Sequence, residues 1–483
     1  MTRGVNTLLK LGEVAITNRY ARKFLLNSIE RRIYEDLIEK NPDDRPLKVQ
    51  EDKCLLGKAL LHSIKRAFDR GLVSNQTARG IIQVFLGNVF FGGFYKRRKF
   101  IEKHGFKPPM FITISPIKSC NLRCKGCYAN ADATPKKLPY DVFDGIIRDA
   151  KKSWGANFFV ISGGEPLMYR DKGKTILDIA KTHDDCFFLM YTNGTLIDEK
   201  MAESLASVGN ITPAVSVEGF KEETDARRGK GVYEKILIAM ENLRNVGVPF
   251  GISVTVTKNN LNLIMTDKFI DFYLNEQGAI YGWYFHYMPI GRDYTLELLP
   301  SPEDRVKLLH EEWKLVKEKD VFLVDFWNSG TASDGCISAA RGGGYFYIDW
   351  DGNICPCVFV PYYLDNVIEL YKNGKNLSDA MQSELFKKIR KWQSDYGYER
   401  PRNEVGNWLR QCPIRDHYDT MHKILTETNA KPNDPSGEEA LKDKEYVRGL
   451  STYGKKIEEL TKETWEYEYL LRNPESKKQS AKR

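Results

Sequence analysis

Inference of the fold starts from one segment, Ser115-Pro-Ile-Lys-Ser-Cys-Asn-Leu-Arg-Cys-Lys-Gly-Cys-Tyr128. It contains three cysteines, Cys120, Cys124 and Cys127, in the spacing C-x3-C-x2-C. Thiolates spaced this closely are typical ligands of an iron–sulfur cluster. A four-iron cluster held by three cysteines keeps one iron open, and an open position distinguishes a reactive metal site from a closed structural one. The alternative interpretation is a structural zinc knuckle.

Short apolar runs recur along the chain, the first of them directly before this segment, and stretches of helical periodicity such as 233–243 and 265–274 separate them. Such runs are typical of strands that are buried on both faces. Strand–helix alternation at this pitch predicts a parallel sheet with right-handed crossovers, and polar ligands bind at the carboxyl ends of its strands. The six predicted strands lie within residues 110–114, 157–161, 186–191, 211–217, 251–256 and 280–288.

A second motif, Gly163-Gly-Glu-Pro166, ends the second run about 40 residues after the cysteine triplet. Together with the aromatic Tyr128 directly after the third cysteine, it resembles the radical S-adenosylmethionine (AdoMet) superfamily. The resemblance implies an α/β fold, a partial (β/α)6 TIM-like barrel, in which the open iron of a [4Fe-4S] cluster chelates the amino and carboxylate groups of AdoMet.

The same resemblance implies the residues that bind AdoMet. Glu165 is expected to face the ammonium group, Thr192 and Asn193 the ribose, and Ser216 with Arg228 the methionine carboxylate. Arg227 is an alternative to Arg228, and either could be a solvated surface arginine. The complete predicted cofactor-binding set is Tyr128, Gly163, Gly164, Glu165, Pro166, Thr192, Asn193, Ser216 and Arg228.

Four further cysteines follow the predicted barrel: Cys336, Cys355, Cys357 and Cys412. An alternating run at 345–350 and the turn signal Asp351-Gly352 predict a hairpin that brings the first of them beside the next two. The pattern resembles the SPASM or twitch extension of radical AdoMet enzymes, which implies one auxiliary [4Fe-4S] cluster. A second is not expected, because the chain lacks the further C-x2-C-x5-C-x3-C run. The alternatives are a zinc site or unrelated buried thiols.

Charge is concentrated at the N-terminus, where residues 1–109 hold 22 Lys and Arg against 11 Asp and Glu. A basic amphipathic helix is predicted over 14–40, and an apolar aromatic stretch at 81–95 precedes Lys96-Arg-Arg-Lys-Phe100. This region can be interpreted as a packing domain with a solvated basic edge. The alternative is that it associates with a membrane surface or gates a lipid-facing tunnel. Nucleic-acid binding is not expected, because no fold signature accompanies the charge.

Nine cysteines, mostly in cluster-like spacings, indicate a reducing compartment, so the expected location is cytoplasmic, with peripheral association at the inner membrane surface as a variant. Four parts are predicted: 1–108 (basic and helical), 109–318 (barrel), 319–430 (auxiliary cluster) and 431–483 (a charged helix and a basic tail over 476–483).

The resemblance implies reductive cleavage of AdoMet to a 5′-deoxyadenosyl radical that abstracts hydrogen from a substrate carbon, with an electron donor such as flavodoxin or ferredoxin. The expected outcome is oxidative modification or cross-linking of a peptide or protein. One alternative is modification of a lipid or polyprenyl substrate. Another is a non-catalytic iron–sulfur electron carrier, against which the Gly163–Pro166 motif argues because a carrier needs no AdoMet pocket.

Overall fold

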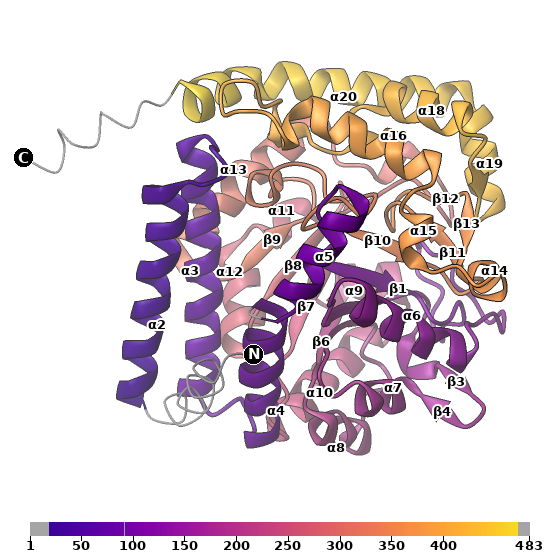
Figure 1. Ribbon diagram of the computed structural model, residues 1–483. Helices are drawn as coiled ribbons and strands as arrows, with labels where there is room; N and C mark the ends of the chain where they lie inside the picture. Colours follow the sequence, from indigo (N-terminus) through magenta and orange to yellow (C-terminus); the bar gives the residue numbers. More distant parts are fainter. Residues whose placement is uncertain (1–18, 91, 472–483) are drawn as a thin grey trace, which may run out of the picture.

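A ten-stranded sheet forms the centre of the protein in a computed structural model that describes residues 19–90 and 92–471 (Figure 1). Neighbouring strands follow the order β13-β11-β10-β1-β2-β5-β6-β7-β8-β9. The strands of this sheet are β1 (Phe111–Ile114), β2 (Phe158–Ile161), β5 (Phe187–Thr192), β6 (Ile211–Val217), β7 (Gly251–Val256), β8 (Gly282–His286), β9 (Leu323–Asp325), β10 (Tyr345–Ile348), β11 (Asn353–Cys355) and β13 (Asp365–Asn366).

The predicted partial barrel is confirmed: β1, β2, β5, β6, β7 and β8 are consecutive parallel neighbours. The structure extends this set in two places. β9 adds a parallel strand beyond β8, and β10 pairs in parallel with β1 on the other side. β10 and β11 form the predicted antiparallel hairpin. Gly352 in its turn has φ +86°, a conformation that favours glycine.

The barrel does not close by hydrogen bonds, because β9 and β13 are the two ends of the sheet. Aromatic rings cover the opening between β9 and β10 instead. The Phe326 ring, just after β9, lies 6.4 Å from the Tyr345 ring on β10 and 5.4 Å from the Phe359 ring. Phe285 on β8 also reaches Phe359, at 6.1 Å. Apolar contacts therefore replace the missing strand pairing at this seam.

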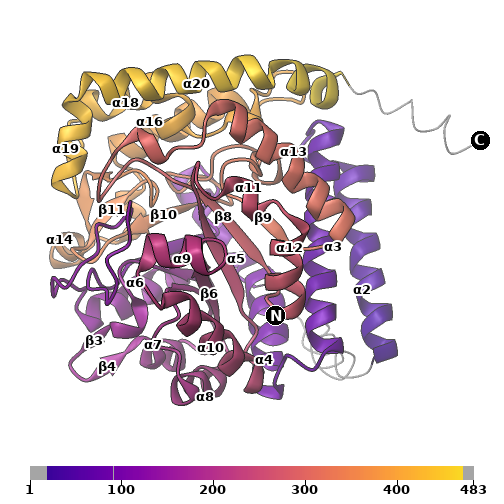
Figure 2. The ribbon, with the colours of Figure 1, turned by 180° about the vertical axis from the view of Figure 1, so that it is seen from behind.

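Amphipathic helices cover the outer face of the barrel (Figures 1 and 2). In the first of them, Phe143, Ile146, Ile147 and Ala150 form one buried stripe at helical spacing. This stripe packs in the same core as the outward-facing Phe159 of β2. The helices are α6 (Tyr140–Ser153), α7 (Ile176–Thr182), α8 (Glu199–Val208), α9 (Lys221–Arg228), α10 (Val232–Asn245), α11 (Leu261–Ile264), α12 (Asp267–Ile270) with the π-helix η4 (Asp271–Glu276), and α13 (Pro302–Lys319).

The N-terminal region is helical, as predicted, and its apolar stretch closes the bottom of the barrel. Its π-helix η2 buries Ile81, Ile82 and Val84. The Phe85 ring lies 5.1 Å from the ring of Phe187 on β5 and also contacts Phe158 on β2. Much of this apolar surface is therefore buried inside the protein. The elements are α2 (Arg19–Tyr34), η1 (Glu35–Lys40), α3 (Leu47–Asp69), α4 (Asn75–Arg79), η2 (Gly80–Phe90) and α5 (Phe94–His104).

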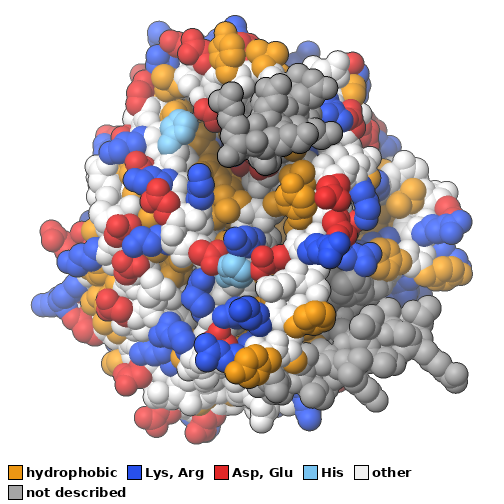
Figure 3. Space-filling model, turned by 90° about the vertical axis from the view of Figure 1, so that its left-hand side faces the viewer, with side chains coloured by type: hydrophobic (Ala, Val, Ile, Leu, Met, Phe, Trp, Pro, Cys, Tyr) orange, Lys and Arg blue, Asp and Glu red, His pale blue; other side chains and the backbone are white. Residues whose placement is uncertain are grey.

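The surface of the N-terminal region mixes charges of both signs, as the face that carries α2 shows (Figure 3). Arg31 pairs with Glu35 and Lys40 pairs with Asp36 along the helix. Phe94 and Tyr95 at the start of α5 are 63% and 68% exposed. Among the described helices, none has the length and apolar character needed to cross a bilayer. The residues of the predicted 14–40 helix that precede Arg19 lie outside the described part of the chain.

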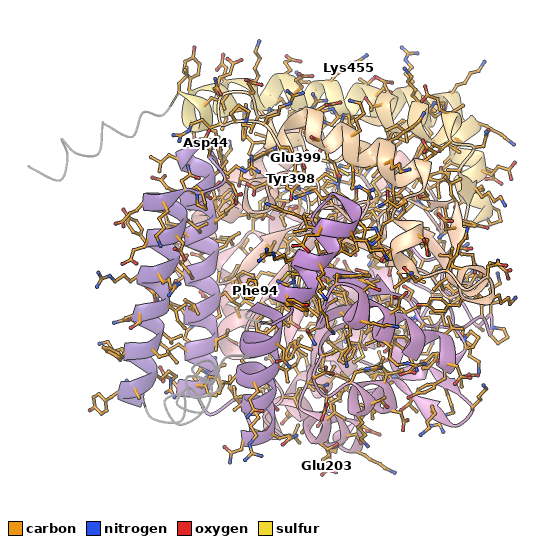
Figure 4. The ribbon with its side chains drawn as sticks, in the orientation of Figure 1. Asp44, Phe94, Glu203, Tyr398, Glu399 and Lys455 are labelled. Carbon is orange, nitrogen blue, oxygen red and sulfur yellow. The ribbon has the colours of Figure 1, made fainter. Side chains whose placement is uncertain are left out.

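A third layer, formed by the C-terminal helices, lies over one end of the barrel (Figures 1 and 2). It consists of α14 (Val367–Lys372), α15 (Leu377–Ala380), α16 (Glu384–Gln393), α17 (Pro413–Asp416), α18 (Tyr418–Glu427), α19 (Pro435–Lys442) and α20 (Lys444–Thr464). Where this layer meets the N-terminal helices, Asp44 pairs with Arg402 and the Arg45 guanidinium donates to the Tyr398 carbonyl oxygen (Figure 4). The predicted basic tail lies outside the described residues.

Candidate active site

A cavity of about 310 Å³ fills the lumen of the barrel and reaches the cysteine loop. Inward-facing strand residues line its depth, and the loop with the polar residues at the carboxyl ends of the strands forms its rim. Of the predicted set, the wall includes Cys120, Cys124, Cys127, Tyr128, Gly163, Gly164, Thr192, Asn193, Ser216 and Arg228, but not Glu165 or Pro166.

The three cysteines of the first motif are brought to this one cavity by a loop anchored at several points. The Cys120 amide donates to the Asp132 carbonyl oxygen at 2.8 Å, and the Lys125 amide donates to the Arg227 carbonyl oxygen at 3.0 Å. Burial raises the pKa of the Cys120 thiol to about 11. A bound metal cluster would offset this cost, since coordination favours the thiolate.

Gly163 and Gly164 let the second motif pass against the backbone of the cysteine loop. A Cβ atom on Gly164 would lie 2.1 Å from the Ser119 carbonyl oxygen, and one on Gly163 would lie 2.6 Å from that of Ile117. The Gly164 amide donates to the Ile117 oxygen and the Glu165 amide to the Ser119 oxygen, both at 2.9 Å. These two glycines therefore permit close approach to the neighbouring loop.

The Glu165 carboxylate lies behind the cavity wall, where it supports two other predicted residues. It accepts hydrogen bonds from the Thr192 hydroxyl and the Asn193 amide, each at 2.8 Å, and from the Leu167 amide at 3.1 Å. Burial raises the pKa of Glu165, while these hydrogen bonds lower it. Pro166, equally buried, begins a 3-10 turn. Contact of Glu165 with the ammonium group of AdoMet stays a prediction, and the geometry gives it a positioning role in addition.

On the opposite side of the rim, the Arg228 guanidinium is held next to the cysteine loop. Its Nε donates to Glu218 at 2.8 Å, and its Nη1 lies 4.0 Å from the Cys124 Sγ. Arg227 binds the same carboxylate at 2.5 Å, so the two arginines that the sequence left open share one partner. Burial alone would lower the pKa of Arg228, but the Glu218 carboxylate and the Cys124 thiol outweigh it and raise the pKa.

Three residues at the site were not predicted. Glu218 is 1% exposed and orients both arginines. Ser253 on β7 faces the cavity beside Ser216, with the two hydroxyl oxygens 3.2 Å apart. Arg292 donates to the Cys124 carbonyl oxygen at 2.7 Å and also to that of Ala131. Their positions in the sequence were the available signal: Glu218 directly follows one predicted strand, Ser253 lies within the next, and Arg292 follows the last. Their hydrogen-bond partners become visible only in three dimensions.

Arg292→Ala is expected to lower the cluster content of the first site at least about threefold, because two carbonyl oxygens of the loop lose a charged donor, a loss of roughly 1.5–3 kcal/mol each. Iron content per chain after reconstitution measures the effect. Arg123→Ala is the matched control, since Arg123 lies in the same loop and is exposed. Equal iron contents in the two variants would show that Arg292 does not hold the loop.

The structure brings together three of the four cysteines of the second group. Cys336, Cys357 and Cys412 line one small cavity beneath the barrel seam, whereas Cys355 does not. Cys355 ends β11, and its Sγ lies 3.9 Å from the Asn433 side-chain amide. Cys186, outside both cysteine groups, is fully buried. Cys54 is half-buried, near the Ile33 carbonyl oxygen.

Comparison with protein families agrees with this geometry. Residues 114–272 match the model of the radical SAM superfamily, and residues 336–412 match that of the SPASM iron-sulfur cluster-binding domain. The chain contains a radical SAM domain followed by a SPASM domain. It is an enzyme of the SPASM-containing type, and the two domains are ones that bind [4Fe-4S] clusters.

Two curated relatives are similar to more than half of this chain. It is 29% identical to the AdoMet-dependent heme synthase of Methanosarcina barkeri, over 54% of this chain and 80% of the relative. It is also 29% identical to the mycofactocin maturase MftC of Mycolicibacterium smegmatis, over 60% of this chain and 75% of the relative. The crystal structure of Streptococcus suis SuiB bound to the precursor peptide SuiA has the same fold, with a TM-score of 0.50, 20% identity, and coverage of 61% of this chain and 70% of that chain.

The residues of the radical SAM site fit the cofactors that the family implies. Three thiols of one loop face the cavity, which matches the ligand set of a cluster with one open iron. The Glu218 Oε2 atom is buried without a hydrogen-bond partner among the described residues, so the polar rim is not saturated by the protein itself. Cys120, Cys124 and Cys127 would hold the cluster, and Asn193, Ser216 and Arg228 would face AdoMet.

Proposed function

We propose that this radical SAM enzyme abstracts a hydrogen atom from an apolar carbon group that its substrate inserts into the barrel lumen. The observation that carries the proposal is the lining of the lumen below the polar rim. Neutral side chains of β1, β2, β5 and β8 line it: Phe111, Phe158, Val160, Leu189, Tyr191, Trp283 and Phe285. A charged substrate group placed there would lose its hydration without an ionic partner, which is costly.

The polarity of the cavity changes with depth. Hydroxyl, amide and guanidinium groups of Thr192, Asn193, Ser216 and Arg228 occupy the rim, next to the cysteines. Toward the amino ends of the strands, aromatic and aliphatic side chains replace them. The rim therefore suits the polar parts of AdoMet, and the depth suits an apolar substrate group. The reacting carbon would lie where the two zones meet.

When bound, the reduced cluster and AdoMet supply the radical that removes the substrate hydrogen. The protein contributes orientation and exclusion of water. Thr192 and Asn193 are held by Glu165, and Arg228 is held by Glu218, so their polar atoms are positioned before the ligand arrives. The aromatic seam of Phe285, Phe326 and Phe359 closes the side of the barrel against solvent.

A peptide that presents an apolar side chain is the first candidate substrate. It is supported by relatives: MftC is a maturase, and SuiB was crystallised with a precursor peptide. Oxidative modification or cross-linking of such a side chain is the reaction that we propose for this candidate. An electron donor such as a flavodoxin or ferredoxin would reduce the clusters.

A hydrocarbon chain of a lipid is the second candidate, favoured by the depth of the lumen. The lining continues to Phe111 and Phe158, the first residues of β1 and β2, and the ring of Phe85 on η2 packs against that of Phe158. The β5 residues from Phe187 to Tyr191 precede the rim residue Thr192 and rise about 3.3 Å per residue, so the apolar zone extends roughly 13 Å along this strand. This length suits a linear chain better than one side chain.

Leu189→Trp tests the proposal by filling the apolar zone. We expect substrate modification to fall at least about tenfold, while AdoMet cleavage in the absence of substrate stays within about twofold, because the rim is unchanged. Ile238→Trp is the matched control, since Ile238 is 54% exposed on α10. Parallel loss of both activities in Leu189→Trp would contradict a substrate role for the lumen.

The substrate class can be assigned by isotope transfer. Peptide, lipid and small polar fractions are prepared from deuterium-labelled cells that lack the gene and added to the reduced enzyme with unlabelled AdoMet. Deuterium in 5′-deoxyadenosine, measured by mass spectrometry, identifies the fraction that donates hydrogen. Transfer from the peptide fraction supports the first candidate and transfer from the lipid fraction the second. Transfer from the polar fraction alone would overturn the assignment of an apolar substrate.

A further inference from the structure

We propose that Cys336, Cys357 and Cys412 hold the auxiliary cluster through three thiolates, that Cys355 is not a ligand, and that one iron of this cluster stays open to a ligand from solution. The match to an iron-sulfur cluster-binding domain over 336–412 assigns no ligands, and the sequence pattern alone suggested four. The inference depends on the position of each thiol and is independent of which substrate the lumen binds.

The three proposed ligands come from separate segments that meet at one cavity of about 30 Å³. Cys336 follows the 3-10 turn Gly330–Ser333, Cys357 lies in the turn after β11, and Cys412 precedes α17. Cys357 and Cys412 are buried there, and Cys336 is half-buried. Three thiols that face one enclosed cavity are a ligand set that cluster iron can use.

Cys355 is separated from this group by a bend of the backbone. β11 ends at Cys355, the chain bends at Pro356, and a turn from Cys357 to Val360 follows, with the Val360 amide donating to the Cys357 carbonyl oxygen at 3.0 Å. The alternation that would place residues two apart on one face of a strand is therefore interrupted. The Cys355 Sγ lies 3.9 Å from Asn433 Nδ2.

The surroundings of Cys355 belong to the hairpin core. Cys355 is fully buried and does not line the three-thiol cavity. Asp349 on the same hairpin is also fully buried, and it accepts a hydrogen bond from the Asn353 side chain at 3.0 Å. Cys355 is therefore packed within the hairpin, apart from the other three thiols.

The other polar groups of the three-thiol cavity are poor replacements for a fourth thiolate. The Ser338 hydroxyl lies 3.2 Å from the Cys336 Sγ and accepts from Gln393 at 3.3 Å. The Ser333 hydroxyl donates to the Gly335 carbonyl oxygen at 2.9 Å. Gln411 donates to the Phe326 carbonyl oxygen, and its neutral amide oxygen is a hard ligand, whereas cluster iron selects soft thiolates.

A ligand of the open iron could arrive through the lumen, because the three-thiol cavity adjoins it. Phe326 and Ile337 line both cavities. Tyr345 lines the lumen with its ring, and its hydroxyl lies 2.9 Å from the Cys357 Sγ. A thin wall of side chains separates the two spaces, so a neutral thiol that enters the lumen lies near the auxiliary site.

Single substitutions test the ligand set through iron content, without reference to activity. Two four-iron clusters give about eight irons per reconstituted chain. We expect Cys355→Ala to keep about eight, and Cys336→Ala, Cys357→Ala and Cys412→Ala each to keep about four. Circular dichroism and binding of AdoMet check that each variant is folded. Loss of about four irons from a folded Cys355→Ala chain would overturn the proposal.

The open iron is tested with cyanide as the probe, in the full chain that carries Cys120→Ala, Cys124→Ala and Cys127→Ala, so that the auxiliary cluster is observed alone. Cyanide is expected to change its electron paramagnetic resonance spectrum, and mild oxidation with ferricyanide is expected to release one iron and give a three-iron signal. An unchanged spectrum with all four irons retained would show four protein ligands. If the spectrum responds to cyanide only after the further substitution Gln411→Ala, the Gln411 amide is the fourth ligand, and the proposal of an open iron is overturned.

Discussion

Replacing Cys120, Cys124 and Cys127 together with alanine is expected to abolish formation of 5′-deoxyadenosine, a loss of at least about a thousandfold, or roughly 4 kcal/mol in activation free energy. The three thiols face one cavity at the mouth of the barrel and have no replacement there among the described residues. Without them, no cluster is left next to the AdoMet rim. Liquid chromatography of anaerobic reactions with dithionite measures the product.

The fold should survive this triple substitution, because the cysteines lie on a half-buried loop and not in the main core. A residual iron content of about four would come from the auxiliary site and would show that the chain is folded. Serine at the three positions gives a second variant with similar volume. Undiminished 5′-deoxyadenosine in a variant that has lost this cluster would contradict the assignment of the site.

Arg305→Met is expected to cost about 3–5 kcal/mol of the free energy of unfolding, because it leaves a buried carboxylate without its partner. Arg305 on α13 is 2% exposed and binds both oxygens of Asp416 on α17, at 2.5 and 3.1 Å. Asp416 also accepts the Cys412 amide at 3.1 Å. The pair therefore joins the barrel to the segment that presents an auxiliary-site cysteine.

Urea unfolding of the reconstituted protein, monitored by tryptophan fluorescence, measures this effect. Lys388→Met is the control, since it removes the partially exposed pair with Glu427 and should cost less than about 1 kcal/mol. We also expect the auxiliary iron of Arg305→Met to be lost at lower urea concentrations than the iron of the first site. Equal midpoints for Arg305→Met and wild type would exclude a structural role for this pair.

Much of the barrel was predictable because its strands are marked locally. Each of the six apolar runs ends at a polar or glycine-containing signature, and each is a strand of the sheet in the expected parallel order. The cysteine triplet and the Gly163–Pro166 motif were equally local, since their residues are neighbours along the chain. The predicted turn at Asp351-Gly352 was found for the same reason.

The apolar stretch at 81–95 shows where local signals stop. Its composition is compatible with a membrane interface and with burial against a sheet, and only the contact of Phe85 with Phe158 and Phe187 distinguishes them. The pairing of β10 with β1 was likewise invisible, because more than 200 residues separate the two strands. Strand pairing at such a distance depends on which edge of the sheet remains free.

The cofactors that the resemblance implies can be inferred from the chain alone, because ligand spacing and strand-end motifs are encoded within short segments. How these residues are used becomes visible only in three dimensions. The tertiary structure turns the Glu165 carboxylate toward Thr192 and Asn193, gives both arginines a shared partner in Glu218, and places Cys355 apart from Cys336, Cys357 and Cys412. The physical reason is that the direction of a side chain follows from backbone bends and packing between distant elements, which no local pattern contains.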